Sequence, residues 1–112
     1  MKNFLFLYRA DYNRMSQASP DEMQANMQKW MDWVGGLAAQ NKLVERGSSL
    51  EASGKMVKDN TVITDGPFAD IKEAIMGYSI VKAGSLDEAA ALADGCPILP
   101  HGTVEVREIR LM

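Results

Sequence analysis

The residue types best suited to chemistry lie together in the stretch Asp65-Gly66-Pro67-Phe68. Gly66 has no Cβ and Pro67 has no N–H, so a sharp turn is predicted here that leaves the Asp65 carboxylate projecting from a loop. Partial desolvation by Phe68 would raise the pKa of that carboxylate toward the range of a general base. The alternative is an Asx-type turn, in which the carboxylate only accepts hydrogen bonds from local N–H groups.

Lys72 and Glu73 follow this stretch closely enough for Lys72 to approach Asp65 if the chain folds back. An ammonium group there would bind an anionic substrate or keep Asp65 ionised. The alternative is a solvated pair on the surface. Asp65 and Lys72 are therefore the candidate catalytic residues, and Gly66, Phe68 and Glu73 are candidate ligand-binding residues.

Three more side chains are candidates for ligand binding. Tyr8 and Tyr78 are predicted to place phenol hydroxyls at the rim of an apolar pocket. His101 lies in a loop before the last expected strand, and as the one histidine of the chain it would shuttle a proton or simply stay exposed. Cys96 has no basic neighbour in the sequence to lower its pKa, which argues against a nucleophilic thiol.

Composition excludes several function classes. The 112 residues are expected to form one domain, residues 1–112, and the charged residues give a net charge of −3 with no basic run, so nucleic acid is not an expected partner. One cysteine and one histidine exclude a disulfide within the chain, a thiolate zinc cluster and a three-histidine site, so no metal is expected. No cofactor motif occurs, and no apolar run is long enough for a membrane span or a signal core. We therefore expect a cytoplasmic protein without a cofactor.

The first half of the chain predicts a strand, a helix and a hairpin. Residues 3–9 are apolar on both faces, as in a central strand, and Ser19 is the predicted N-cap of a helix that runs to about residue 41. Gly35 and Gly36 inside it predict a kink or a close backbone approach. Strands are expected near 49–52, 55–58 and 61–64, with a turn at 59–60 and an end to the third strand at residue 65. The apolar stripe expected to face the core comprises Met23, Met27, Trp30, Met31, Val34 and Ala38.

The second half predicts a strand at 76–83, a short helix capped by Ser85, and a last strand at 103–110. Near Arg107 the apolar residues change from one face of this last strand to the other. This change predicts either a bulge or a strand end that lies in a different environment. The order β-α-β-β-β-α-β indicates an α+β fold, a ferredoxin-like antiparallel sheet with two helices on one face and an added hairpin. Because the other face also carries apolar residues, we expect a homodimer with the two sheets packed face to face.

The stretch 62–73, read as VITDGPFADIKE and followed by Gly77-Tyr78, resembles the signature of the DGPF family of YCII-related proteins. The resemblance extends over the rest of the chain and implies a dimeric α+β barrel. Relatives in the wider group include a dehydrochlorinase, and the barrel superfamily includes lactone isomerases. The chain departs from the pattern at Trp30 and Cys96, where related proteins carry a histidine and an aspartate.

Two functions remain open on this basis. The first is a cofactor-independent isomerase, lyase or dehydrochlorinase acting on a small anionic metabolite, with Asp65 as base and Lys72 as anion partner. The second is a non-catalytic dimeric module that binds a small ligand or regulates. The retained motif favours the first function, and the missing histidine–aspartate pair favours the second.

Overall fold

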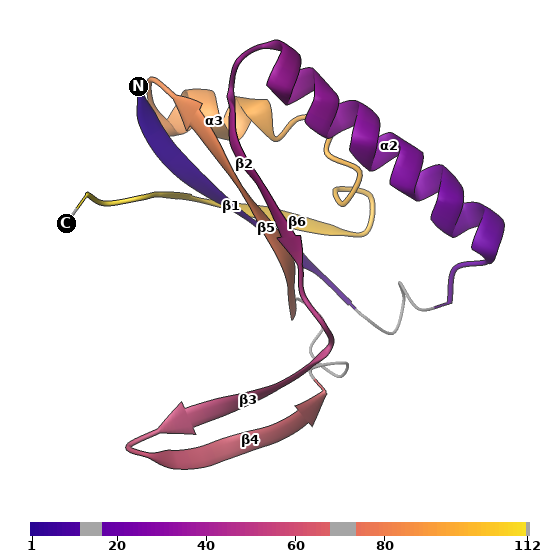
Figure 1. The fold of residues 1–112 in the computed structure, drawn as a ribbon, viewed down its shortest axis with the longest axis vertical. Coiled ribbons are helices and arrows are strands. Elements are labelled where there is room, and N and C mark those ends of the chain that lie inside the picture. The colour runs from indigo at the N-terminus through magenta and orange to yellow at the C-terminus, as the bar shows by residue number, and fades with distance from the viewer. Residues whose placement is uncertain (12–16, 68–73, 112) are drawn as a thin grey trace.

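The computed structural model describes residues 1–11, 17–67 and 74–111, and for residues 62–67 it describes the backbone only. In the described residues six strands and two helices follow one another along the chain (Figure 1). Their bounds are β1 Lys2–Ala10, α2 Pro20–Ala39, β2 Leu43–Ser49, β3 Ser53–Lys58, β4 Thr61–Pro67, β5 Ala74–Ala83, α3 Leu86–Leu92 and β6 Gly102–Glu108. Four strands separate the helices, one more than the order β-α-β-β-β-α-β contains, and the first of them lies at residues 43–49 and not near 49–52 as expected.

The main sheet has four strands in the order β2-β5-β1-β6, all paired antiparallel. This is the strand order of a ferredoxin-like fold with a hairpin inserted between its second and third main strands, so the predicted α+β class is confirmed. β1 lies inside the sheet between β5 and β6, as its two apolar faces predict. β6 pairs with β1 without interruption up to Glu108, so the bulge considered near Arg107 is absent and the strand simply ends.

Both predicted N-caps are confirmed. The Ser19 hydroxyl accepts a hydrogen bond from the Glu22 N–H at 3.1 Å, and the Ser85 hydroxyl accepts one from the Glu88 N–H at 3.1 Å. Each bond satisfies a donor that the first helical turn leaves without a partner. A Cβ at Gly35 would meet nothing within 4 Å, so the helix has no close backbone approach there.

The core lies between the sheet and the helices. Phe4, Phe6 and Tyr8 point from β1 toward the helices, and Trp30 and Trp33 of α2 pack against them. The Tyr8 and Trp30 rings meet edge to face with centroids 4.9 Å apart, and Phe6 stacks on Trp33 at 6.2 Å.

The predicted methionine stripe is wrong for most of its members. Met23, Met27 and Met31 are 60%, 64% and 53% exposed, whereas Leu37 in the last turns of the helix is 2% exposed. Figure 1 shows the reason, because the N-terminal part of α2 extends beyond the edge of the sheet and has no core beneath it. Helical periodicity gives the side of a helix that is apolar, but not how much of that side is covered.

β3 and β4 form a separate two-stranded sheet that stands apart from the main sheet at the bottom of Figure 1. The predicted turn is confirmed, because Asp59 and Asn60 have φ values of 51° and 64°, the left-handed values that a two-residue hairpin turn requires. The prediction that Asp65 ends the strand is wrong, since β4 continues to Pro67. Pro67 is tolerated because β4 has a strand partner on one side only.

The face of the main sheet that points away from the helices carries an apolar patch. We call it the far-face patch: Leu5 and Leu7 of β1 with Tyr78 and Ile80 of β5, which are neighbours in the strand pairing and only half-buried. At its border Glu105 pairs with Arg9 at 2.8 Å and with Arg107 at 3.3 Å. Neither described helix is long and apolar enough to cross a membrane.

Candidate functional site

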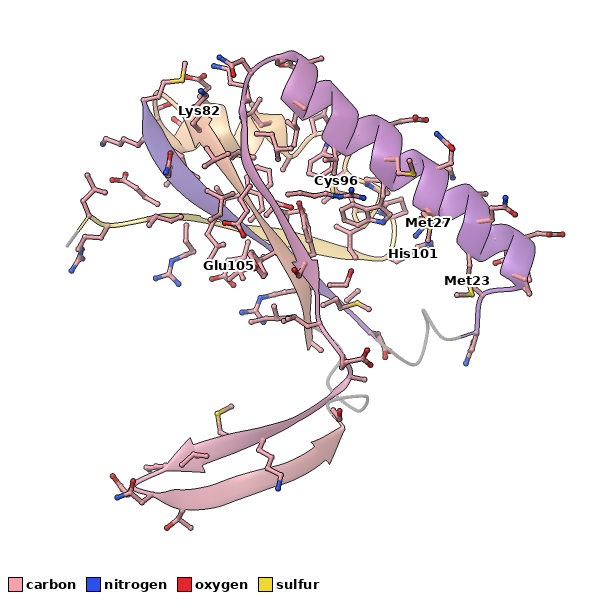
Figure 2. The ribbon with its side chains drawn as sticks, in the orientation of Figure 1. Met23, Met27, Lys82, Cys96, His101 and Glu105 are labelled. Atoms are coloured by element: carbon pink, nitrogen blue, oxygen red, sulfur yellow. The ribbon has the colours of Figure 1, made fainter. Side chains whose placement is uncertain are left out.

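A cleft of about 680 Å³ lies between α2 and the turns that connect α3 to β6. We call it the helix–loop cleft. Figure 2 shows Cys96 and His101 on this connection, beside α2. One wall comes from the helix and the other from the turns, and the lining residues are Asn26, Lys29, Asp32, Trp33, Gly95, Cys96, Pro97, Leu99, Pro100 and His101.

Backbone hydrogen bonds within the turns fix the wall that carries His101. The Cys96 N–H donates to the Ala93 carbonyl at 3.1 Å, and the His101 N–H donates to the Ile98 carbonyl at 2.9 Å. Ile98 is 4% exposed and anchors the segment in the core. Gly95, with a φ of +77°, provides the left-handed residue that commonly follows a helix end.

Trp33 and Asp32 are held on the helical wall. The Trp33 indole N–H donates to the Asp94 carbonyl at 3.2 Å, which ties α2 to the turns that follow α3. The Asp32 carboxylate accepts a hydrogen bond from the Gln28 side chain at 2.9 Å. Lys29 is exposed and lies one helical turn before Trp33.

This set of side chains suits a small, flat, negatively charged ligand. An indole ring provides an apolar surface for a ring compound, and an ammonium group attracts its charge. His101 adds an imidazole, whose ring nitrogens can accept or donate a proton. Cys96 does not add a nucleophile, because burial raises the pKa of its thiol to about 11 and keeps it protonated.

His101 is the predicted site residue that lines the cleft. Tyr8 does not line it: it is 6% exposed, and its hydroxyl donates to the Ser79 hydroxyl at 2.8 Å. Burial raises the pKa of Tyr8 further above its ordinary value, although the bond to Ser79 opposes this. Tyr78 lies in the far-face patch, on the other side of the sheet from Tyr8, so the two phenols do not share a pocket.

The motif stretch is described only in part. Asp65 and Gly66 lie in β4, where the strand pairing sets them opposite Lys55 and Gly54 of β3. This extended backbone replaces the expected sharp turn. Phe68 lies outside the described residues, as do Lys72 and Glu73, and so does the Asp65 side chain. Their catalytic and ligand-binding roles remain predictions.

Sequence reasoning missed four polar residues that the structure gives a role. Asn26, Lys29 and Asp32 recur every three residues, a spacing that places polar groups along one side of a helix and could have indicated a lined wall. Ser79 occupies a position of β5 whose side chain faces the core, and a serine at such a position could have indicated a buried hydrogen-bond partner. Among the residues that the structure describes, no group of three or more His, Cys, Asp or Glu side chains could hold a metal ion.

Comparison with known proteins gives the family. The profile of the YCII-related domain matches residues 4–112. The chain belongs to the YCII-related family. The resemblance noted from the Asp-Gly-Pro-Phe motif is thereby confirmed, and the match extends from the first strand past the last one.

Two proteins illustrate how this YCII-related chain compares with others. An uncharacterized protein of Rhizobium meliloti (strain 1021) is 34% identical over 86 residues, which is 66% of this chain and 69% of that protein. Among solved structures, the 5-chloro-2-hydroxyhydroquinone dehydrochlorinase of Burkholderia phenoliruptrix AC1100, in complex with 2,5-dihydroxybenzoquinone, aligns with a TM-score of 0.50 and 18% identity. The alignment covers 98% of this chain and 95% of the dehydrochlorinase. It shows that the two proteins share a fold.

Proposed function

We propose that this YCII-related protein is a cofactor-independent enzyme of the isomerase, lyase or dehydrochlorinase type, acting on a small anionic ring compound in the helix–loop cleft. The observation that carries the proposal is the presence of His101, Lys29 and Trp33 in one cleft. The fold neighbour supports the reaction class, since it is a dehydrochlorinase whose complex holds a small ring compound.

In this proposal each side chain has one task. Trp33 stacks on the ring, Lys29 holds the negative charge, and His101 takes the proton. In a dehydrochlorination the proton passes to the imidazole, the electron pair that it leaves forms the new double bond, and chloride departs with the electrons of the carbon–chlorine bond. The balance needs no oxidant or reductant, which agrees with chemistry that uses no cofactor.

Asp65 is the second candidate base, with Lys72 as its anion partner. Their support is the family motif, so variants must separate them from the cleft residues. We would measure chloride release and thermal stabilisation with chlorinated hydroquinones, lactones and small carboxylates. His101→Gln is expected to abolish turnover without changing the melting temperature by more than a few degrees. If Asp65→Asn abolishes turnover and His101→Gln does not, the base is Asp65 and the assignment to His101 is wrong.

Lys29→Met tests the anion contact. It is expected to weaken ligand binding about tenfold or more, which corresponds to about 1.4 kcal/mol or more of binding free energy. Lys2→Met is the matched control, because Lys2 is exposed at the start of β1 and does not line the cleft. Equal affinity in the two variants would contradict the proposed role of Lys29.

A non-catalytic ligand-binding module is the second candidate function. One observation favours it: no described side chain hydrogen-bonds the His101 imidazole, whereas catalytic bases are usually oriented by a third group. A compound that raises the melting temperature but is recovered unchanged would support the module. Product formation that depends on His101 would support the enzyme.

We also propose that the protein is a homodimer with its sheets packed face to face. The support is the far-face patch, which lies opposite the helices and borders the Arg9–Glu105 pair. Light scattering is expected to give twice the 12.3 kDa chain mass, and Leu7→Lys is expected to reduce it to the monomer value, whereas Met31→Lys on α2 is not. A monomer mass for the unaltered chain would refute the proposal. The cytoplasmic location, the single domain over residues 1–112, and the absence of nucleic-acid partners stay predictions.

A further inference from the structure

A second cleft, of about 390 Å³, adjoins the helix–loop cleft on α2. We call it the interhelix cleft, because one wall is the C-terminal half of α2 and the other is the end of α3 with Asp94 after it. Asp32 and Trp33 line both clefts, so the two clefts meet at these residues. Together they form one groove, which follows α2 for about 20 Å from Asn26 to Gln40.

Gly36 leaves the interhelix cleft open at its helical wall. It lies three residues after Trp33 and seven after Lys29, which places the three residues along one side of α2. A Cβ at Gly36 would meet nothing within 4 Å, so no neighbouring element packs against this position. Glycine destabilises a helix interior relative to alanine, and close packing does not require it here. The open space at Gly36 is therefore available to a ligand.

The charged side chains of the groove follow one another in a fixed order. Lys29 lies in the helix–loop cleft, Asp32 lies where the clefts meet, and Asp94 lies in the interhelix cleft. Lys29 and Asp32 are three residues apart, a spacing that allows an ion pair on a helix, but among the described residues no ion pair joins them. The Asp32 carboxylate instead accepts the hydrogen bond from Gln28. Both charges are thus available to a ligand.

The Trp33 ring lies between the positive and the negative part of this groove. Its N–H donates to the Asp94 carbonyl, which holds the ring in place and keeps Asp94 beside α2. A ligand ring that packs on Trp33 therefore has the ammonium group of Lys29 toward one end and the carboxylates of Asp32 and Asp94 toward the other.

We propose that the ligand of the helix–loop cleft carries an amine-bearing side chain, which extends past Trp33 into the interhelix cleft and ends between Asp32 and Asp94. The inference rests on the proposed function, because the ring and its acid group bind as stated there. Carboxylates bind an ammonium group through charge-assisted hydrogen bonds, and the opposite charges along the groove favour one orientation of the ligand. The substrate class is then a ring compound with an acid group at one end and an aliphatic amine at the other.

Three benzoates test the inference by titration calorimetry. Benzoate has the ring and the acid group, 4-propylbenzoate adds an apolar tail, and 4-(2-aminoethyl)benzoate adds a tail of equal length that ends in an amine. Asp32→Asn removes the charge and keeps an acceptor for Gln28. It is expected to weaken binding of the amine about fivefold without weakening binding of 4-propylbenzoate. Asp21→Asn is the matched control, because Asp21 is exposed on the same helix outside both clefts.

The adjacent glycines of α2 give a second matched pair of variants. Gly36→Leu fills the interhelix cleft and is expected to weaken both tailed compounds about tenfold while benzoate binds as before. Gly35→Leu is expected to change none of the three affinities, because Gly35 is exposed and lines neither cleft. Both variants are expected to melt at or above the temperature of the unaltered protein, since leucine favours a helix over glycine.

The outcomes separate this inference from the proposed function. The inference is wrong if Gly36→Leu weakens the tailed compounds no more than Gly35→Leu, or if Asp32→Asn weakens the amine no more than Asp21→Asn. In either case, benzoate binding that is lost in Lys29→Met leaves the proposed function standing. If none of the three compounds shows binding that depends on Lys29, both proposals are overturned.

Discussion

A buried chain of hydroxyl groups permits a quantitative prediction about Tyr8. The Tyr8 hydroxyl donates to Ser79 at 2.8 Å, and the Ser79 hydroxyl donates to the Arg46 carbonyl at 2.6 Å. Tyr8→Phe removes one hydrogen bond and leaves Ser79 bonded to Arg46, which costs about 1 kcal/mol of unfolding free energy. Ser79→Ala removes both bonds and leaves the phenol hydroxyl buried without a partner, which costs about 2–3 kcal/mol.

These free energies convert into melting temperatures. An unfolding entropy of about 2.1 cal/mol/K per residue over 112 residues makes 1 kcal/mol equal to about 4 °C. Tyr8→Phe is expected to melt about 4 °C below the unaltered protein, and Ser79→Ala about 8–12 °C below it. In the double variant Tyr8→Phe is expected to recover part of the cost of Ser79→Ala, because it removes the phenol hydroxyl that was left buried without a partner, so the two costs are not additive.

Urea and thermal unfolding of the unaltered protein, the two single variants and the double variant would measure these costs. All four are compared at one fixed protein concentration, since an oligomer melts at a temperature that depends on concentration. A cost for Tyr8→Phe equal to or above that of Ser79→Ala would refute the reasoning, as would additive costs. Ligand affinity is the second readout. Because Tyr8 lies outside the helix–loop cleft, Tyr8→Phe is expected to leave affinity unchanged, and a selective loss of affinity would restore its predicted role at the site.

Two further predictions concern glycine and acid stability. Gly47 has a φ of +78°, and a Cβ there would collide with the Tyr78 carbonyl oxygen, so Gly47→Ala is expected to cost about 2 kcal/mol or more by urea unfolding, whereas Gly35→Ala in the open helix gains about 0.5–1 kcal/mol. Equal effects would contradict the structure. The Lys42 ammonium holds the pKa of Glu88 below its ordinary value of 4.5, so the stability that ionised Glu88 contributes is present above pH 4.5 and lost as the pH falls through the lowered pKa. Below pH 4.5 the melting temperature is therefore expected to fall more steeply for the unaltered protein than for Glu88→Gln, and parallel slopes in a calorimetric pH series would show that the pair does not stabilise the fold.

Much of the fold could be predicted because its signals act over a few residues. A serine hydroxyl accepts a hydrogen bond from an N–H only three residues ahead, so the local sequence is enough to predict both helix N-caps. Two residues that tolerate a positive φ mark the turn at Asp59-Asn60. The two apolar faces of β1 indicated an interior strand, and together these elements allowed one main sheet arrangement, the ferredoxin-like one.

Other features depended on contacts between distant parts of the chain. The sequence shows that Met27 and Leu37 share a side of one helix, but the edge of the sheet decides that only Leu37 is covered. His101 was a candidate from its chemistry, whereas the presence of Lys29 in the same cleft depends on the packing of the turns after α3 against α2. The Tyr8 hydroxyl has a partner 71 residues away, which no local pattern specifies.

The sequence by itself therefore determined where both helices begin, where the hairpin turns and which family the chain belongs to, because capping, turn geometry and alternation are short-range effects that each segment carries alone. Only the tertiary structure decided which side chains share the cleft and which apolar surfaces stay uncovered. The physical reason is that packing depends on the lengths and relative positions of whole elements, and those are set when the chain closes on itself.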